Sequence, residues 1–171
     1  VSLLYACFGM IQRSISPLVT PIMEDLSISF SEIGAILGAW QLTYIVVAII
    51  GGTIMDRFGI RKALLFGILI IGLSAALRYF ANGFVSLLLF VALFGLGGPM
   101  ISIGCPKTIA EWFRGKERGT ALGVFMAASA TGGLLSFLTV NSVVMPFTGD
   151  SWRLTFVLFS LPAFMAALLW W

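Results

Sequence analysis

The sequence contains no histidine and only two cysteines, Cys7 and Cys105, among its 171 residues. Without histidine there is no Ser-His pair for nucleophilic catalysis and no imidazole ligand for a metal ion. Two cysteines cannot form a four-ligand cluster, and no glycine-rich phosphate loop with its lysine is present. The sequence therefore predicts neither a cofactor nor the use of ATP, and a membrane enzyme is the weakest functional hypothesis.

Charged residues are also scarce, at 10% of the chain, whereas 60% are hydrophobic and the mean hydropathy is +1.07. Such a chain has too little polar surface for a water-soluble globule and must be solvated by lipid. A helix of about 20 residues crosses a hydrocarbon core of roughly 30 Å. The stretches of suitable length are residues 1–22, 33–55, 63–80, 84–110, 119–146 and 153–171. No alternating pattern indicates membrane-spanning strands, so we predict an all-α membrane protein with six transmembrane helices in one domain, residues 1–171.

The basic residues are distributed unevenly over the connections. The connections after the second and fourth helices, which lie on one side of the membrane, carry six basic residues: Arg57, Arg61, Lys62, Arg114, Lys116 and Arg118. The other side of the membrane has only Arg153 and, at a helix end, Arg78, whose side chain is expected to reach the interface by snorkelling. The connections after the second and fourth helices should therefore be cytoplasmic, in a plasma (inner) membrane protein. The net charge of +3 is then a topological bias, so the lipid bilayer is an expected partner and nucleic acid is not.

A glycine-flanked charged segment joins the second and third stretches, and its sequence is GTIMDRFGIRK over residues 52–62. It resembles the loop between helices two and three of the major facilitator superfamily, whose pattern is roughly G-x-L-x-D-R-x-G-R-R-K. Ile60 stands where arginine is common. The matching positions are Gly52, Asp56, Arg57, Gly59, Arg61 and Lys62. The resemblance implies that this loop belongs to the inner gate of a secondary transporter, and Gly59 is expected to make a turn with positive φ.

The resemblance extends over the rest of the chain. Trp112-Phe113 followed by Lys116-Glu117-Arg118-Gly119 is similar to the family's connection between helices four and five, and Trp152-Arg153 resembles the start of helix six. The family then implies that Asp56, Arg57, Glu117 and Arg118 form a cytoplasmic latch in the outward-facing state. The alternative for Arg57, Arg61 and Lys62 is that they only anchor the chain at lipid headgroups.

An internal similarity supports a repeated architecture. The pattern E-x-G-x-x-L-G occurs at residues 32–38 and again at 117–123, and Pro21 and Pro106 have the same separation. We therefore expect two three-helix repeats, about residues 1–82 and 83–171, in opposite orientations, as in each half of this superfamily. Because the chain starts and stops inside apolar stretches, we expect the first six of twelve helices and a C-terminal six-helix half as partner. A complete six-helix protein is the alternative.

Polar groups at membrane depth are the candidates for substrate binding, because ionisable residues there are costly and usually functional. Arg13 is the deepest, and all seven carboxylates lie at or near helix ends. A substrate anion could provide its partner; so could a carboxylate of a second half, or Arg13 could serve helix packing. Lys107 either pairs with Glu111 four residues on or closes the lower end of a cavity.

The other candidates are uncharged. The second helix offers Gln41 and Tyr44 on one face, where each could either bind substrate or satisfy a neighbouring helix. The fourth helix carries a small-residue surface that permits close helix contact. That surface consists of Gly95, Gly97, Gly98, Ser102, Gly104 and Pro106. The substrate-binding prediction is thus Arg13, Gln41, Tyr44, Ser102 and Lys107. The fifth helix has Ala128–Gly133 in place of the G-P-x-x-G-G pattern of drug/proton antiporters, which disfavours an exporter of cationic drugs.

These observations favour the amino-terminal half of a major facilitator transporter that carries a small anion by alternating access. The rival hypothesis is a non-transporting sensor or assembly partner that has kept the transporter scaffold.

Overall fold

The structure is a computed structural model that describes every residue of the chain except the side chain of Ile54. All regular elements of the described chain are helices, and no strand occurs in this part. The long helices are α3 (Phe30–Phe58), α4 (Ile60–Leu77), α5 (Phe84–Trp112), α6 (Gly115–Thr139) and α8 (Trp152–Trp170). The shorter ones are α1 (Ser2–Arg13), η1 (Ser16–Leu18), α2 (Val19–Leu26), η2 (Arg78–Phe80), the π-helical η3 (Val140–Val144) and α7 (Met145–Phe147).

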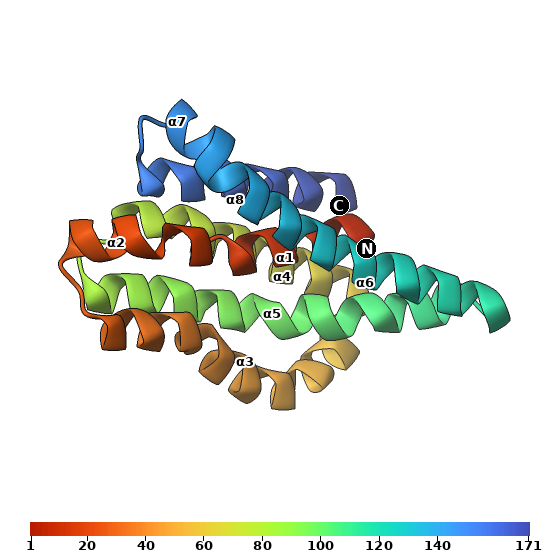
Figure 1. Cartoon of the computed structure of the whole chain (residues 1–171). Helices are drawn as coiled ribbons and strands as arrows, with labels where there is room; N and C mark the ends of the chain where they lie inside the picture. The colour runs from red at the N-terminus through yellow and green to blue at the C-terminus, as the bar shows by residue number, and fades with distance from the viewer.

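Five segments of the described chain are long and apolar enough to cross a membrane: Phe30–Thr53, Ile60–Phe80, Phe84–Trp112, Gly115–Phe147 and Trp152–Trp170. The predicted stretch 1–22 is different, because α1 ends at Arg13 and η1 separates it from α2. Pro17 lies inside η1, where its missing N–H cannot continue an α-helical ladder. The prediction of six helices is therefore confirmed for five, and the first is interrupted directly after Arg13 (Figure 1).

Polar and glycine residues define the ends of α3. Ser29 Oγ accepts the Glu32 backbone N–H at 3.3 Å while the Glu32 carboxylate accepts the Ser29 N–H at 2.8 Å, which is a capping box. At the other end, Gly59 alone separates α3 from α4 and has φ 82°. The positive φ expected at Gly59 is confirmed. The helix continues to Phe58, however, so Asp56 and Arg57 lie in its last turn rather than in a loop.

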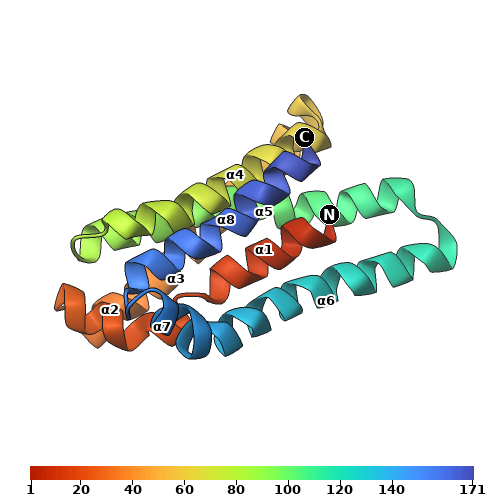
Figure 2. The same cartoon turned by 90° about the horizontal axis from the view of Figure 1, so that it is seen from above.

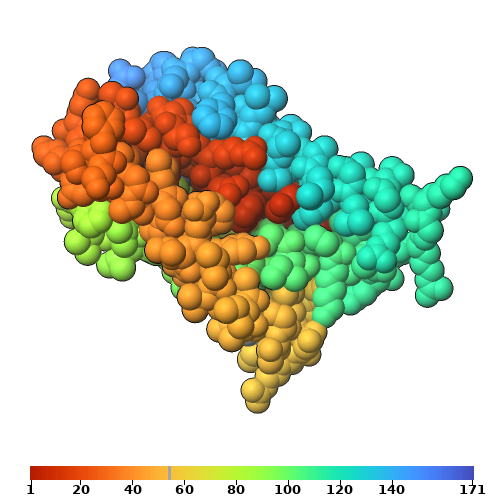
Figure 3. All heavy atoms as spheres, turned by 60° about the horizontal axis from the view of Figure 1, so that its bottom comes forward, coloured from red at the N-terminus to blue at the C-terminus, as the bar shows by residue number. Residues whose placement is uncertain are grey.

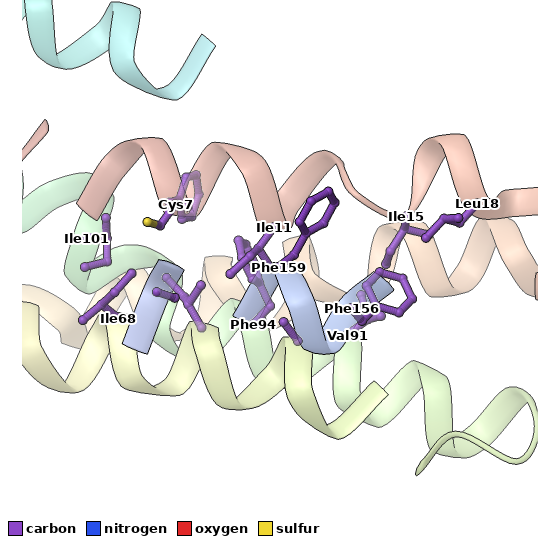
Figure 4. Packing of buried hydrophobic residues seen from close by; sticks show 14 of the residues in the cluster. Cys7, Ile11, Ile15, Leu18, Ile68, Val91, Phe94, Ile101, Phe156 and Phe159 are labelled. Atoms are coloured by element: carbon purple, nitrogen blue, oxygen red, sulfur yellow. The ribbon is translucent and has the colours of Figure 1, made fainter. Parts of the chain in front are cut away.

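The helices pack around α1 and α5. α5 contacts α3 and α4, while α1 contacts α6, α8 and α5 (Figures 1 and 2). The core between α1, α5 and α8 is apolar, with Ile11, Ile15, Val91, Phe94, Phe156 and Phe159 buried together (Figure 4). This arrangement leaves one face of α1 uncovered between α3 and α6 (Figure 3).

Glycines of α5 allow its neighbours to approach closely, as the small-residue surface predicted. A Cβ on Gly97 would lie 2.5 Å from the Gly67 carbonyl oxygen of α4. A Cβ on Gly95 would lie 2.7 Å from Thr43 Cβ of α3. Both distances are too short for a real Cβ contact, so α5 can hold α3 and α4 at this separation only with glycine at these positions.

Candidate functional site

A cavity of about 480 Å³ opens on the uncovered face of α1. Helices α1, α3, α5 and α6 surround it, and Figure 3 shows α1 recessed between α3 and α6. Its lining consists of Tyr5, Phe8, Gln12, Arg13, Trp40, Gln41, Tyr44, Ile45, Ser102 and Ser129. The structure thus brings together four of the five residues predicted to bind substrate: Arg13, Gln41, Tyr44 and Ser102.

Arg13 contributes the only charged side chain to this lining. It is the last residue of α1, and its side chain is exposed to the cavity. Among the described side chains the ion pairs are Lys107–Asp56 and Arg153–Asp25, and no hydrogen bond of the Arg13 guanidinium is present. Arg13 therefore has no anionic partner within the described chain, as the positions of the carboxylates predicted.

The α1 side of the cavity is built by a regular contact with α6, which runs beside α1 in the same direction (Figures 1 and 2). Tyr5 stacks on Phe125 with ring centroids 4.0 Å apart. One turn further along both helices, Gly9 lies against Ser129, and one turn further again the Arg13 side chain lies against Gly133. Successive turns of α1 thus meet successive turns of α6.

The opposite wall is formed by α3 and α5. The Tyr44 hydroxyl on α3 and the Ser102 hydroxyl on α5 are 2.7 Å apart and share a hydrogen bond. Trp40 meets Tyr44 edge to face at 6.0 Å between ring centroids. The cavity therefore has an aromatic surface beside hydroxyl and amide groups, with one cation on the α1 side.

Sequence reasoning did not select Gln12, Trp40 or Ser129 as lining residues. Gln12 is adjacent to Arg13, and Ser129 lies within the small-residue segment Ala128–Gly133. These positions in the sequence could have identified Gln12 and Ser129 as lining residues. Nothing in the sequence could have identified Trp40, because an aromatic residue in an apolar helix is usually part of a core or faces lipid.

Lys107 lies outside the cavity lining. Its Nζ is 2.6 Å from Asp56 Oδ1, and the two side chains are 43% and 69% exposed. Sequence reasoning had offered Glu111 or the cavity as its partner. The structure selects Asp56 because α3 reaches Phe58 while packed along α5, so the last turn of α3 faces Lys107.

The predicted gating residues occupy one end of the molecule and are exposed. The end of α3 contains Gly52, Asp56 and Arg57, and Gly59 separates α3 from α4. The first turn of α4 contains Arg61 and Lys62, and the first turn of α6 contains Glu117 and Arg118. No ion pair joins Asp56 to Arg118 among the described side chains. The latch of Asp56, Arg57, Glu117 and Arg118 stays a prediction. Arg61, which is not part of this latch, donates a hydrogen bond to the Trp171 carbonyl oxygen at 2.5 Å.

The expectation that the Arg78 side chain snorkels to the interface is wrong. Its side chain is 1% exposed, with the guanidinium carbon 5.0 Å from the centre of the Phe156 ring. Its Nη2 donates to Ser74 Oγ at 3.4 Å, while Nε and Nη1 have no partner. Arg78 is enclosed because α8 packs over η2. The hydropathy of a single helix does not show which of its residues another helix covers.

Comparison with known proteins places this arrangement in a family. The profile described as "Major Facilitator Superfamily" matches residues 1–171. A hexuronate transporter of Bacillus subtilis (strain 168) is 30% identical over 161 residues, which are 94% of this chain and 37% of that protein. A probable L-galactonate transporter of Escherichia coli (strain K12) is 32% identical over 162 residues, 93% of this chain and 34% of that protein.

Solved structures share the fold. A bacterial homolog of the human lysosomal transporter Spinster superimposes with a TM-score of 0.85 at 21% identity, over 99% of this chain and 40% of that one. The xylose transporter XylE of E. coli gives 0.78 at 21% identity, over 99% of this chain and 45% of that one. The chain thus spans less than half the length of each of these proteins.

Proposed function

The chain belongs to the major facilitator superfamily, and from this premise we propose that it is the amino-terminal half of a transporter for a small anionic solute. A single observation carries the proposal: Arg13 lies unpaired in a cavity whose lining contains no carboxylate. An unpaired guanidinium at membrane depth is costly, and a bound anion would compensate it through charge-assisted hydrogen bonds.

The rest of the lining suits an anion that also carries hydroxyl groups. Gln12, Gln41 and Ser129 add uncharged hydrogen-bonding groups, and the Tyr44–Ser102 pair adds two hydroxyls. Trp40 and Tyr5 add aromatic groups to the lining. A sugar acid has a carboxylate, several hydroxyls and an apolar face of C–H groups. Relatives named as transporters of hexuronate and L-galactonate support this substrate class.

Transport would proceed by alternating access, with a second membrane unit facing the cavity. The chain corresponds to 37% and 34% of its two relatives, and the exposed cavity-side faces of α3 and α6 leave room for such a unit. We propose that the chain itself consists of two inverted three-helix repeats, about 1–82 and 83–171. The connections at Gly59 and at Phe113–Gly115 would be cytoplasmic in the inner membrane, as their cations favour.

Uptake into proteoliposomes tests the proposal. The protein, expressed from its complete gene, should accumulate radiolabelled D-glucuronate or L-galactonate. Arg13→Gln should raise KM by roughly ten- to hundredfold, the value of a hydrogen bond to a charged group, without loss of folded protein. Arg13→Lys should retain weak uptake, because a point cation replaces a planar fork.

Thermal unfolding separates the alternatives for Arg13. If a carboxylate of the second unit pairs with it, Arg13→Gln should lower the melting temperature, and neutralising that carboxylate should restore it. Stabilisation by D-glucuronate that survives intact in Arg13→Gln would contradict the proposed role. Binding of the anion without any flux would favour the rival function, a sensor on a transporter scaffold.

A further inference from the structure

Three glycines of the contact between α1 and α6 are buried, but they meet different atoms. A Cβ on Gly132 would fall within 2.8 Å of the backbone carbonyl carbon of Ala6, with the carbonyl oxygen closer still. A Cβ on Gly9 would lie 2.9 Å from the Ser129 carbonyl carbon, again with the oxygen closer. At these two positions the glycine lets one backbone approach the other.

Gly133 is different, because the three atoms nearest to a Cβ there all belong to the Arg13 side chain. Cδ would be 2.5 Å away and Cζ 3.0 Å, and Nη1 would be closer than either. The Arg13 side chain therefore lies directly on the α6 backbone at Gly133. Glycine is unfavourable within a helix compared with alanine, and close backbone packing does not account for it at this position.

No hydrogen bond or ion pair with the described side chains holds the Arg13 guanidinium in place. A long, unpaired side chain would otherwise sample several rotamers. Its position beside the cavity is thus defined by the surface on which it rests. That surface is available only while residue 133 has no side chain.

We propose that Gly133 is a positioning residue that determines where the Arg13 guanidinium meets the substrate's anionic group. The inference rests on the proposed function, in which Arg13 provides the counter-charge. A methyl group at position 133 displaces the flexible end of Arg13 rather than a backbone, so α1 and α6 keep their packing. The anionic group then meets a misplaced cation, and the site loses affinity.

The experiment measures initial uptake rates of radiolabelled D-glucuronate and L-galactonate in proteoliposomes containing the complete protein. Gly133→Ala should raise KM by roughly ten- to hundredfold, as the loss of a hydrogen bond to a charged group predicts. The maximal rate should change far less, because the interaction is made in the bound ground state and the transition state alike. Gly34→Ala is the matched control: it adds the same methyl group to a helix where a Cβ meets nothing within 4 Å.

A double-mutant cycle with Arg13→Gln distinguishes this inference from the proposed function. If Gly133 acts through Arg13, Gly133→Ala should raise KM in the parent protein and leave it unchanged in Arg13→Gln. An unchanged KM in Gly133→Ala, with a raised KM in Arg13→Gln, would refute the role of Gly133 alone. An unchanged KM in Arg13→Gln would refute the counter-charge itself.

Folding provides a second readout. Should Gly133→Ala fail to yield a monodisperse protein, the double variant Gly133→Ala/Arg13→Ala should recover it, because alanine at position 13 lacks the Cδ, Cζ and Nη1 atoms that meet the new methyl group. Failure of both variants would mean that Gly133 serves the packing of the helices, and the inference would be wrong.

Discussion

Individual residues in this protein are best understood from the partners that they have or lack. Arg13 and Arg78 are both arginines within apolar stretches, but Arg13 faces a cavity while Arg78 is enclosed under Phe156. The sequence predicted only that Arg13 has no carboxylate partner within this chain, because all seven carboxylates lie at or near helix ends. It could not predict the enclosure of Arg78, because the Phe156 ring that covers Arg78 comes from a helix distant in the sequence.

Arg78 should be replaceable by an apolar residue of similar length. Two of its nitrogens have no partner, and each unsatisfied buried donor costs about 1–3 kcal/mol. Arg78→Met removes that cost and keeps most of the packing, so its melting temperature should equal or exceed that of the parent. Arg78→Ala leaves a cavity and should lose about 2 kcal/mol or more. Equal losses in both variants, measured by thermal unfolding in detergent, would show that the charge itself is needed.

The helices were largely predictable because long apolar stretches between charged connections leave few alternatives. Five of the predicted spans correspond to continuous helices, and the chain turns at Gly59 as expected. The first predicted span is divided into α1 and α2 by η1, and the sequence did not predict this break, which lies at Pro17. Partners across helices were the least predictable: Lys107 pairs with Asp56 of α3 rather than with Glu111 of its own helix, because inter-helix contacts depend on rotation and register.

The pair between α3 and α5 leads to a prediction on gating. Lys107 and Arg118 would compete for Asp56 if the latch forms in the outward-facing state. Asp56→Asn should then shift the protein towards inward-facing states, whereas Lys107→Gln should free Asp56 for the latch and shift it outwards. The shift for Lys107→Gln should be about 0.2–1 kcal/mol, as for other exposed pairs.

Accessibility of single cysteines from each side of the membrane measures these populations. A cysteine variant with both Asp56 and Lys107 intact is the reference. Shifts in the same direction for the two substitutions would contradict competition for Asp56, and unchanged labelling in Asp56→Asn would remove Asp56 from the gate.

At the scale of the whole molecule, the charged residues lie at or near the ends of the bundle, with the exception of Arg13. Asp25 lies at the end of α2 and binds Arg153 and the Trp152 Nε1 of α8, which fastens that end of the bundle. Asp56 binds Lys107 near the other end. No carboxylate lines the cavity beside Arg13. If Arg13 binds the anionic group of the solute as proposed, a coupling proton has to be carried by a different group.

This separation predicts that no carboxylate of this chain carries a coupling proton. Glu32 is engaged in the capping box of α3, and Glu111 is exposed near the end of α5. Glu32→Gln and Glu111→Gln should therefore leave proton-driven accumulation of D-glucuronate intact, with a loss of about 1 kcal/mol in stability at most from the altered cap. Counterflow, which needs no proton gradient, is the control in the same proteoliposomes. Loss of accumulation with normal counterflow in either variant would place the coupling site within this chain, whereas retention in both would remove Glu32 and Glu111 as carriers of the coupling proton.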